Sequence, residues 1–295
     1  MRKHNSSVSS NEDINGCYTS DEALCVNTTR STLKLGCSHI ISFCEFNGIS
    51  SPVLKGGVIY LSNYRSSEPI SLTISHSSFE MCNTTGSFVA EEGGGVIYAG
   101  CGSLSITSSS FISCQSPSYG GAILAQFNCT SSCLSHCTFI SCRAHHGGSI
   151  MTEYGPTSSI FSSRFISCVA DYVGGGMYHD INDVSDSVTI RKSLFTRNPA
   201  DYKNEFEDKI RGGGAFEDFQ EAAYGVHYFF SFFTLNVAQS GSGHDISLIK
   251  HPITQDSFTS CFTTTSINSF WNNHTHEINW LPLINTHVTF YDSLC

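Results

Sequence analysis

Short apolar segments separated by serine-rich corners recur along this chain. In one such stretch, Leu104 and Ile106 alternate with serines, which is the pattern of a half-buried strand with a period of two residues. Phe111 opens a second short apolar segment, and Gly120 and Gly121 lead into a third. Three short strands with corners between them, in so short a stretch, predict one turn of a parallel β-helix.

The same unit recurs along most of the chain, as a tetrapeptide that begins with phenylalanine and is followed by a polar loop and adjacent glycines. The earliest unit begins at Phe43, and later phenylalanines lie at intervals that vary from 26 residues (139 to 165) to 38 residues (195 to 233). A period of this size with variable loops is typical of a solenoid. Stacked turns lie about 4.8 Å apart, so each repeat position forms a ladder along the axis. We expect the interior phenylalanine ladder to consist of Phe79, Phe111, Phe139, Phe165, Phe195 and Phe233.

Four of the fourteen cysteines occupy one repeat position, three residues after a ladder phenylalanine. These four are Cys82, Cys114, Cys142 and Cys168. A free cysteine packs as a small hydrophobic residue, which favours an interior thiol ladder. The distance between adjacent turns also lies within the Cα range that a disulfide can span, so the sequence leaves the oxidation state open.

The composition argues against several classes of partner. Charged residues make up 14% of the chain, against about 25% in ordinary domains. Serine and threonine supply the polarity instead, which suits a ladder surface because stacked like charges would repel. The formal net charge is −10 and no basic stripe is present, so we expect neither nucleic-acid binding nor attraction to an anionic membrane. No apolar run is long enough to predict a membrane span.

Cysteines and potential glycosylation sites together favour a cell-surface or secreted location. Five asparagines are followed two residues later by serine or threonine, namely Asn5, Asn27, Asn83, Asn128 and Asn273. No apolar segment of a leader follows Met1, so we expect the chain to be either a fragment or the product of a gene model that lacks its first exon.

The repeats divide the chain into three parts. Residues 1–30 are polar and carry no repeat, so we expect a flexible or capping segment. Residues 31–256 hold the repeats, and 257–295 are expected to form a last turn and a cap. A cap is required because an open end of a solenoid exposes unpaired strand edges.

Two short motifs give the repeats a family resemblance. Residues 120–123 read G-G-A-I, and residues 195–198 and 233–236 read F-x-x-N. This pair of motifs resembles the repeat of the chlamydial polymorphic outer-membrane proteins. It is also similar to the repeats of β-helix surface proteins in parasitic protists such as trichomonads. Cysteine replaces asparagine at four F-x-x-N positions, and this replacement fits the protist proteins better than the bacterial ones. The resemblance implies a right-handed parallel β-helix of about seven to nine turns, surface display or adhesion, and no cofactor.

An enzyme of the pectate lyase or polygalacturonase type is the alternative, because the pectin lyase-like β-helix also carries such activities. Three titratable residues follow a ladder phenylalanine by six positions, namely His145, Asp171 and Asp201. If they stack on successive turns, they form a candidate catalytic site. The competing interpretation is a solvated corner where aspartate caps a turn. Asp180, Asp183 and Asp186 have the spacing of a loose calcium loop, but no ordered glycine or distal glutamate completes the pattern, so a hydrophilic loop is the better explanation and we expect no metal site.

Sequence variety is expected in the loops between F-x-x-C and the glycine pair, because stacking fixes the strands. The two longest such loops span residues 83–92 and 199–211. The second loop holds the candidate binding residues Tyr202, Glu205, Phe206, Glu207 and Asp208. We therefore expect a non-enzymatic structural or adhesin-like protein whose partner is a host-cell or matrix protein or glycan; the other interpretation of this loop is a tolerated insertion with no role.

Overall fold

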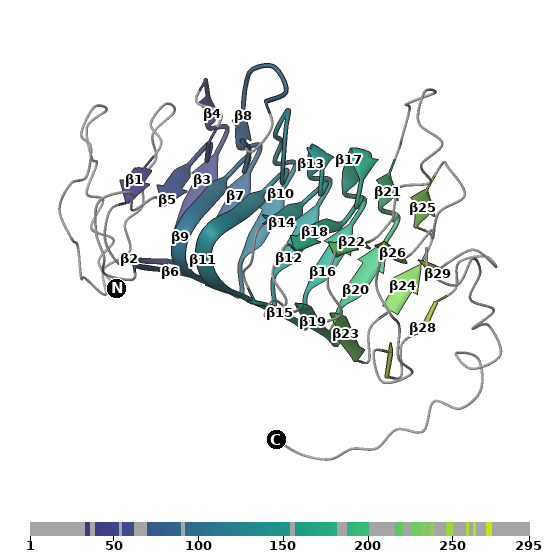
Figure 1. Ribbon diagram of the computed structural model, residues 1–295. Coiled ribbons are helices and arrows are strands. Elements are labelled where there is room, and N and C mark those ends of the chain that lie inside the picture. Colours follow the sequence, from purple (N-terminus) through teal and green to yellow (C-terminus); the bar gives the residue numbers. More distant parts are fainter. Residues whose placement is uncertain are drawn as a thin grey trace, which may run out of the picture.

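Parallel strands stacked side by side give this all-β chain the form of a β-solenoid (Figure 1). The computed structural model describes residues 33–35, 39–52, 55–61, 70–89, 92–153, 157–181 and 188–200, and the backbone of short strands between 216 and 272. These residues form strands, turns and bends, and no helix occurs among them. In the part of the chain so described, therefore, no helix exists that could cross a membrane.

Each turn places its strands on three main faces and one short fourth face. The face after the glycine pair contains β1 (Leu33–Leu35), β5 (Ile59–Leu61), β14 (Ile150–Glu153), β18 (Met177–Ile181), β22 (Phe216–Gln220), β26 (Ile246–Ile249) and β29 (Phe270–Asn272). The second face contains β2 (His39–Ser42), β6 (Ser71–Ser75), β15 (Thr157–Phe161), β19 (Val188–Arg191), β23 (Val226–Phe229) and β27 (Phe258–Thr259). Two longer strands, β9 (Ile97–Thr107) and β11 (Ile123–Ser135), run through both faces and join them into one 15-stranded sheet.

The third face carries the phenylalanine strands in an 8-stranded parallel sheet. Its members are β3 (Glu45–Asn47), β7 (Ser78–Glu80), β10 (Ser110–Ile112), β12 (Thr138–Ile140), β16 (Arg164–Ile166), β20 (Leu194–Thr196), β24 (Phe232–Thr234) and β28 (Phe262–Thr263). The short fourth strands are β4 (Ser50–Ser51), β8 (Asn83–Thr84), β13 (Arg143–His146), β17 (Val169–Val173), β21 (Pro199–Ala200) and β25 (Val237–Ala238). The sequence predicted three strands in each turn, and this fourth strand lies where only a loop was expected.

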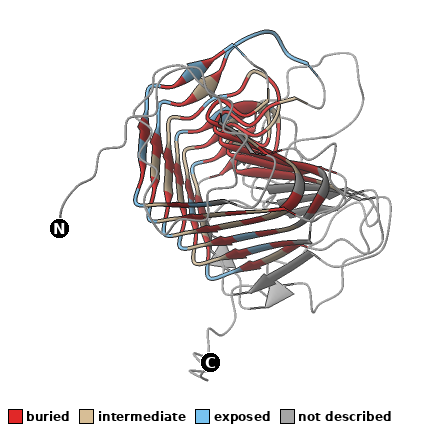
Figure 2. Cartoon of the chain, turned by 90° about the vertical axis from the view of Figure 1, so that its left-hand side faces the viewer, coloured by how far each residue is buried: buried red, intermediate tan, exposed pale blue. Residues whose placement is uncertain are grey.

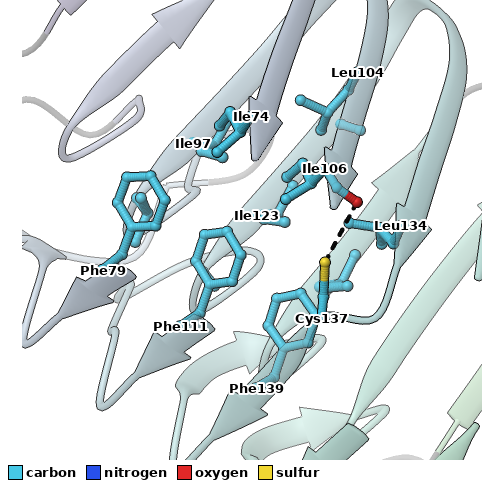
Figure 3. Packing of buried hydrophobic residues seen from close by; sticks show 14 of the residues in the cluster. Ile74, Phe79, Ile97, Leu104, Ile106, Phe111, Ile123, Leu134, Cys137 and Phe139 are labelled. Carbon is cyan, nitrogen blue, oxygen red and sulfur yellow. Dashed lines mark hydrogen bonds between the residues drawn. The ribbon is translucent and has the colours of Figure 1, made fainter. Parts of the chain in front are cut away.

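The phenylalanines of the third face form one continuous stack in the core (Figure 3). Phe111 lies 4.9 Å from Phe79 and 4.9 Å from Phe139, measured between ring centroids, and the rings are nearly parallel. The strands pair in register from turn to turn, so identical side chains meet. The stack continues through Phe46, Phe165 and Phe195, all of them buried.

The first unit of the repeat begins three residues later than the sequence suggested. Phe46 pairs with Phe79 and stacks on its ring at 4.8 Å. Phe43 instead lies at a corner, where 67% of it is exposed and its ring stacks on His76. Both phenylalanines fit the spacing, and only the pairing of the strands separates them.

The turns bend at corners, and buried residues line their inside (Figure 2). Three corners of each turn have a backbone with positive φ. The glycine corner was expected: Gly120 has a φ of 55°, and a Cβ at Gly121 would lie 2.1 Å from the carbonyl oxygen of Gly148 in the next turn. The other two corners carry non-glycine residues such as Ser113 (φ 53°) and His136 (φ 55°). Non-glycine residues rarely adopt a positive φ, so contacts with neighbouring turns must hold these corners in place.

A buried polar ladder follows each of the two non-glycine corners. After the first, Cys44, Ser77, Ser109, Cys137, Ser163 and Ser193 lie inside the turns. The hydroxyl of Ser163 accepts a hydrogen bond from the Cys137 amide (3.2 Å) and donates one to the Phe161 carbonyl (3.0 Å). After the second corner, the ladder consists of Cys82, Cys114, Cys142, Cys168, Asn198 and Asn236.

The thiols of the second ladder are buried and free. The Cys142 thiol donates to the Phe111 carbonyl of the preceding turn, 3.5 Å away, and Cys114 contacts the Phe79 carbonyl in the same way. Figure 3 shows the related contact in the first ladder, where the Cys137 thiol reaches the Ile106 carbonyl at 3.4 Å. In this structure, therefore, the four cysteines of the second ladder are free thiols and not disulfides.

Candidate functional site

An exposed apolar segment lies on the side of the solenoid where the short fourth strands run. It follows β8 and includes Phe88 and Val89, which are 46% and 39% exposed. The Val89 amide donates a hydrogen bond to the Ser118 hydroxyl at 2.9 Å, which fastens the segment to the next turn. Large exposed apolar side chains grouped in this way are typical of contact surfaces.

Beneath this segment lies a group of aromatic and imidazole rings that we name the ring cluster: Phe88, Tyr119, His145, His146, Tyr172 and Tyr178. The Phe88 ring lies 4.6 Å from the His145 ring and 5.9 Å from the Tyr119 ring, between centroids. His145 in turn stacks on Tyr172, at 5.3 Å and with an angle of 16° between the planes. The exposed Phe88 ring therefore rests on a layer of ordered rings.

The strand register explains how residues from separate turns converge in the ring cluster. Tyr119 forms a parallel bridge with His146, which pairs with Val173 of β17. Tyr119 and Tyr172 pack on a second core cluster outside the main stack, which consists of Tyr98, Leu124, Met151, Val173 and Tyr178. The ring cluster is thus supported from below by buried side chains and is open to solvent at Phe88.

The electrostatics of the site depend on two imidazoles and one ion pair. His145 and His146 bring their Nδ1 atoms within 2.8 Å, so one ring donates a hydrogen bond to the other. Burial lowers the pKa of His145, and the negative charge of Asp171 partly opposes this shift. Beside them, Arg143 Nη2 and Asp171 Oδ1 form an ion pair at 2.6 Å whose side chains are both exposed. At neutral pH the site thus combines a neutral His145 ring with a compensated charge pair beside it.

Of the candidate catalytic residues, His145 and Asp171 lie on adjacent turns, but an irregular strand register separates them from direct pairing. A register shift between Ala144 and His146 displaces β13 against β17. In consequence, Asp171 pairs with Arg143, and His145 stacks on Tyr172 and not on Asp171. Asp201 lies outside the described residues. Counting six residues from the ladder phenylalanine fails here because an irregularity in the strand intervenes.

Eight of the ten predicted binding and glycosylation residues lie outside the part of the chain that the structure describes. These are the loop residues Tyr202, Glu205, Phe206, Glu207 and Asp208, and the glycosylation candidates Asn5, Asn27 and Asn273. Asn128 lies in β11, and Phe233 pairs with Phe195 through its strand. Asn83 lies in β8, with its Oδ1 atom buried.

Sequence reasoning singled out His145 but missed Phe88 and the other members of the ring cluster. A signal was present, because Tyr60, Tyr98 and Tyr178 each follow a glycine pair at the same offset. That offset marks an outward position, and repeated aromatic residues there indicate a second apolar layer outside the solenoid. Phe88 itself lies in the loop 83–92 that was expected to vary.

Comparisons with known protein families, with curated proteins and with solved structures find no match to this chain. Within the described residues, no group of three or more His, Cys, Asp or Glu side chains is arranged to hold a metal ion. The site brings together an exposed phenylalanine, stacked rings and an imidazole pair. Such rings pack against apolar side chains or against the apolar faces of sugar rings.

Proposed function

We propose that this chain is a non-enzymatic, adhesin-like surface protein that presents binding loops on a right-handed β-helix of about seven to nine turns. Its partner would be a protein or glycan of a cell surface or matrix, and its location the cell surface or the extracellular space. The resemblance to polymorphic outer-membrane protein repeats supports this role. The repeated stack supports it too, because a scaffold fixed by ladders leaves its variable loops free for recognition.

The observation that carries the proposal is the exposed Phe88 resting on the ring cluster. A ring that is 46% exposed and also packed on His145 and Tyr119 loses little freedom when a partner covers it. Rigid aromatic anchors of this kind dominate the energy of many interfaces. The ion pair of Arg143 and Asp171 would lie at the polar rim of such a contact.

A matched pair of variants tests the proposal. Phe88→Ser removes the anchor, and Met81→Ser removes a side chain of similar exposure (49%) at a corner that does not belong to the ring cluster. Binding isotherms of the full chain on cells, extracellular matrix and glycan arrays should weaken at least about tenfold for Phe88→Ser, as for an interface anchor. Met81→Ser should bind like the parent chain. Equal binding by all three proteins would contradict the proposal.

The second long loop and the enzymatic alternative have their own tests. Deleting residues 204–209 should leave the melting temperature nearly unchanged, because loop length costs little closure entropy. Unchanged binding after this deletion would exclude that loop as the contact surface. Turnover of a polyuronate by the purified chain, abolished by Asp171→Asn or Asp201→Asn in a folded protein, would favour a pectate lyase-like or polygalacturonase-like enzyme instead.

A further inference from the structure

Three oxygen-bearing side chains occupy one position on three consecutive strands of the first face. Gln126 of β11 pairs with Glu153 of β14, and Glu153 pairs with Asp180 of β18. The strands are parallel and in register, so these residues form a short ladder with neighbours about 4.8 Å apart. Figure 1 shows β11, β14 and β18 side by side.

This ladder faces away from the main core. Leu124, Met151 and Tyr178 precede its three members by two residues and belong to the second core cluster, outside the phenylalanine stack. Side chains two apart on a strand lie on the same side of the sheet, so the ladder continues that outer layer. Gln126 and Glu153 are almost fully buried there, at 0% and 4% exposure, and Asp180 is half-buried.

The Gln126 side chain supplies a second observation. Its Nε2 donates a hydrogen bond to Glu153 Oε2, so the amide lies directly against the buried carboxylate. Its Oε1 is buried as well and has no hydrogen-bond partner among the described residues. A buried carbonyl oxygen without a donor is costly, and it is a ligand that hard cations accept.

We propose that Gln126, Glu153 and Asp180 form a binding site for a divalent hard cation, with calcium as the best fit. The ladder places two carboxylates and one amide oxygen at the same position of adjacent strands, and oxygens of these kinds are the ligands that hard cations accept. Calcium accepts six to eight oxygens, including amide carbonyls and waters, in flexible geometry. Magnesium requires a stricter octahedral arrangement, which a ladder of side chains fits less well.

Coordination by this site would be completed by water or backbone carbonyls, since it has only two carboxylates. Such a ligand set corresponds to the weak class of calcium sites, with dissociation constants of about 10⁻⁴ to 10⁻³ M. The site lies on strands of the scaffold, and the inference does not depend on the adhesive role proposed above. A bound ion would tie three consecutive turns together at their outer layer.

Two measurements on the full chain test the site. Calcium added to chelator-treated protein should raise the melting temperature saturably in the millimolar range, because a ligand that binds only the folded state stabilises it. Terbium should show luminescence sensitised by tyrosine, because Tyr178 lies two residues from Asp180 on the same side of the strand. Both signals should be lost in Glu153→Gln and in Asp180→Asn.

The control is Asp171→Asn, which removes an exposed carboxylate that pairs with Arg143 away from this ladder. It should retain both signals. If Glu153→Gln does not fold, Asp180→Asn decides, because its side chain is only half-buried. The proposal is overturned if the parent chain shows neither signal, or if both signals persist in Asp180→Asn.

Discussion

The backbone amide of Cys168 donates a hydrogen bond to Oδ1 of Asn198 in the next turn, 2.9 Å away. This contact joins the thiol part of the second ladder to its amide part. Asn198 also donates from Nδ2 to the Phe165 carbonyl (3.0 Å), the same kind of carbonyl that the thiols of Cys114 and Cys142 contact. Cysteine in four turns and asparagine in the next two can thus occupy the same repeat position, because both can donate to the carbonyl of the phenylalanine in the preceding turn.

Asn198→Ala should lower the free energy of unfolding by about 1–3 kcal/mol, because it leaves buried backbone groups without partners. Asn198→Cys should cost less, since a thiol can still donate to the Phe165 carbonyl. Urea denaturation of the two variants measures the difference. An alanine variant as stable as the cysteine variant would show that these hydrogen bonds contribute nothing.

The buried ladder thiols should resist chemical modification in the folded protein. Burial raises the pKa of Cys82 and of Cys137 to about 11, and raises the pKa of Cys142 and Cys168 well above the usual value. At pH 8 these groups are therefore protonated and poorly nucleophilic. Maleimide labelling followed by peptide mapping should modify the exposed Cys133 and leave the buried ladder cysteines unmodified until urea is added. Rapid labelling of the ladder, or disulfides within it, would contradict this account.

Acid should destabilise the fold through His179, whose side chain is fully buried and hydrogen-bonded to Thr152. Burial lowers its pKa from 6.5 to about 3, so the unfolded chain binds the proton more tightly than the folded one. This contribution to stability is complete above pH 6.5 and is lost as the pH falls toward 3, at roughly 1 kcal/mol per pH unit. His179→Leu should flatten the dependence of unfolding free energy on pH in this window.

The exposed His136 provides the control for that measurement. His136→Gln should keep the parent slope between pH 6.5 and 3, because this exposed substitution leaves the buried His179 unchanged. If His179→Leu and the parent chain lose stability in parallel as the pH falls, other groups govern the acid transition.

The repeat spacing was enough to predict the parallel solenoid and the phenylalanine stack, because identical residues recur where identical environments recur. It could not separate Phe43 from Phe46, since both fit the spacing and only strand pairing distinguishes them. It also could not place positive φ at Ser113 or His136, because these residues carry no glycine-like signal. The structure of neighbouring turns, and not the local sequence, imposes that conformation.

The candidate site was harder to predict than the core for a related reason. Phe88, Tyr119 and His145 come from different turns, and their convergence depends on the irregular register of β13. A residue count assumes regular strands, so it assigned His145 to a stack with Asp171. Only the ladder positions, where the strands are regular, could be predicted from the sequence.

The most direct test of this account compares two phenylalanines in one denaturation experiment. Phe139 is fully buried between Phe111 and Phe165, and Phe43 is 67% exposed at a corner. Phe139→Ala should lower the free energy of unfolding by about 3–5 kcal/mol, as for other buried aromatic residues, whereas Phe43→Ala should stay within about 1 kcal/mol of the parent chain, as for surface substitutions. Equal effects of the two substitutions would contradict a scaffold built on a buried phenylalanine stack.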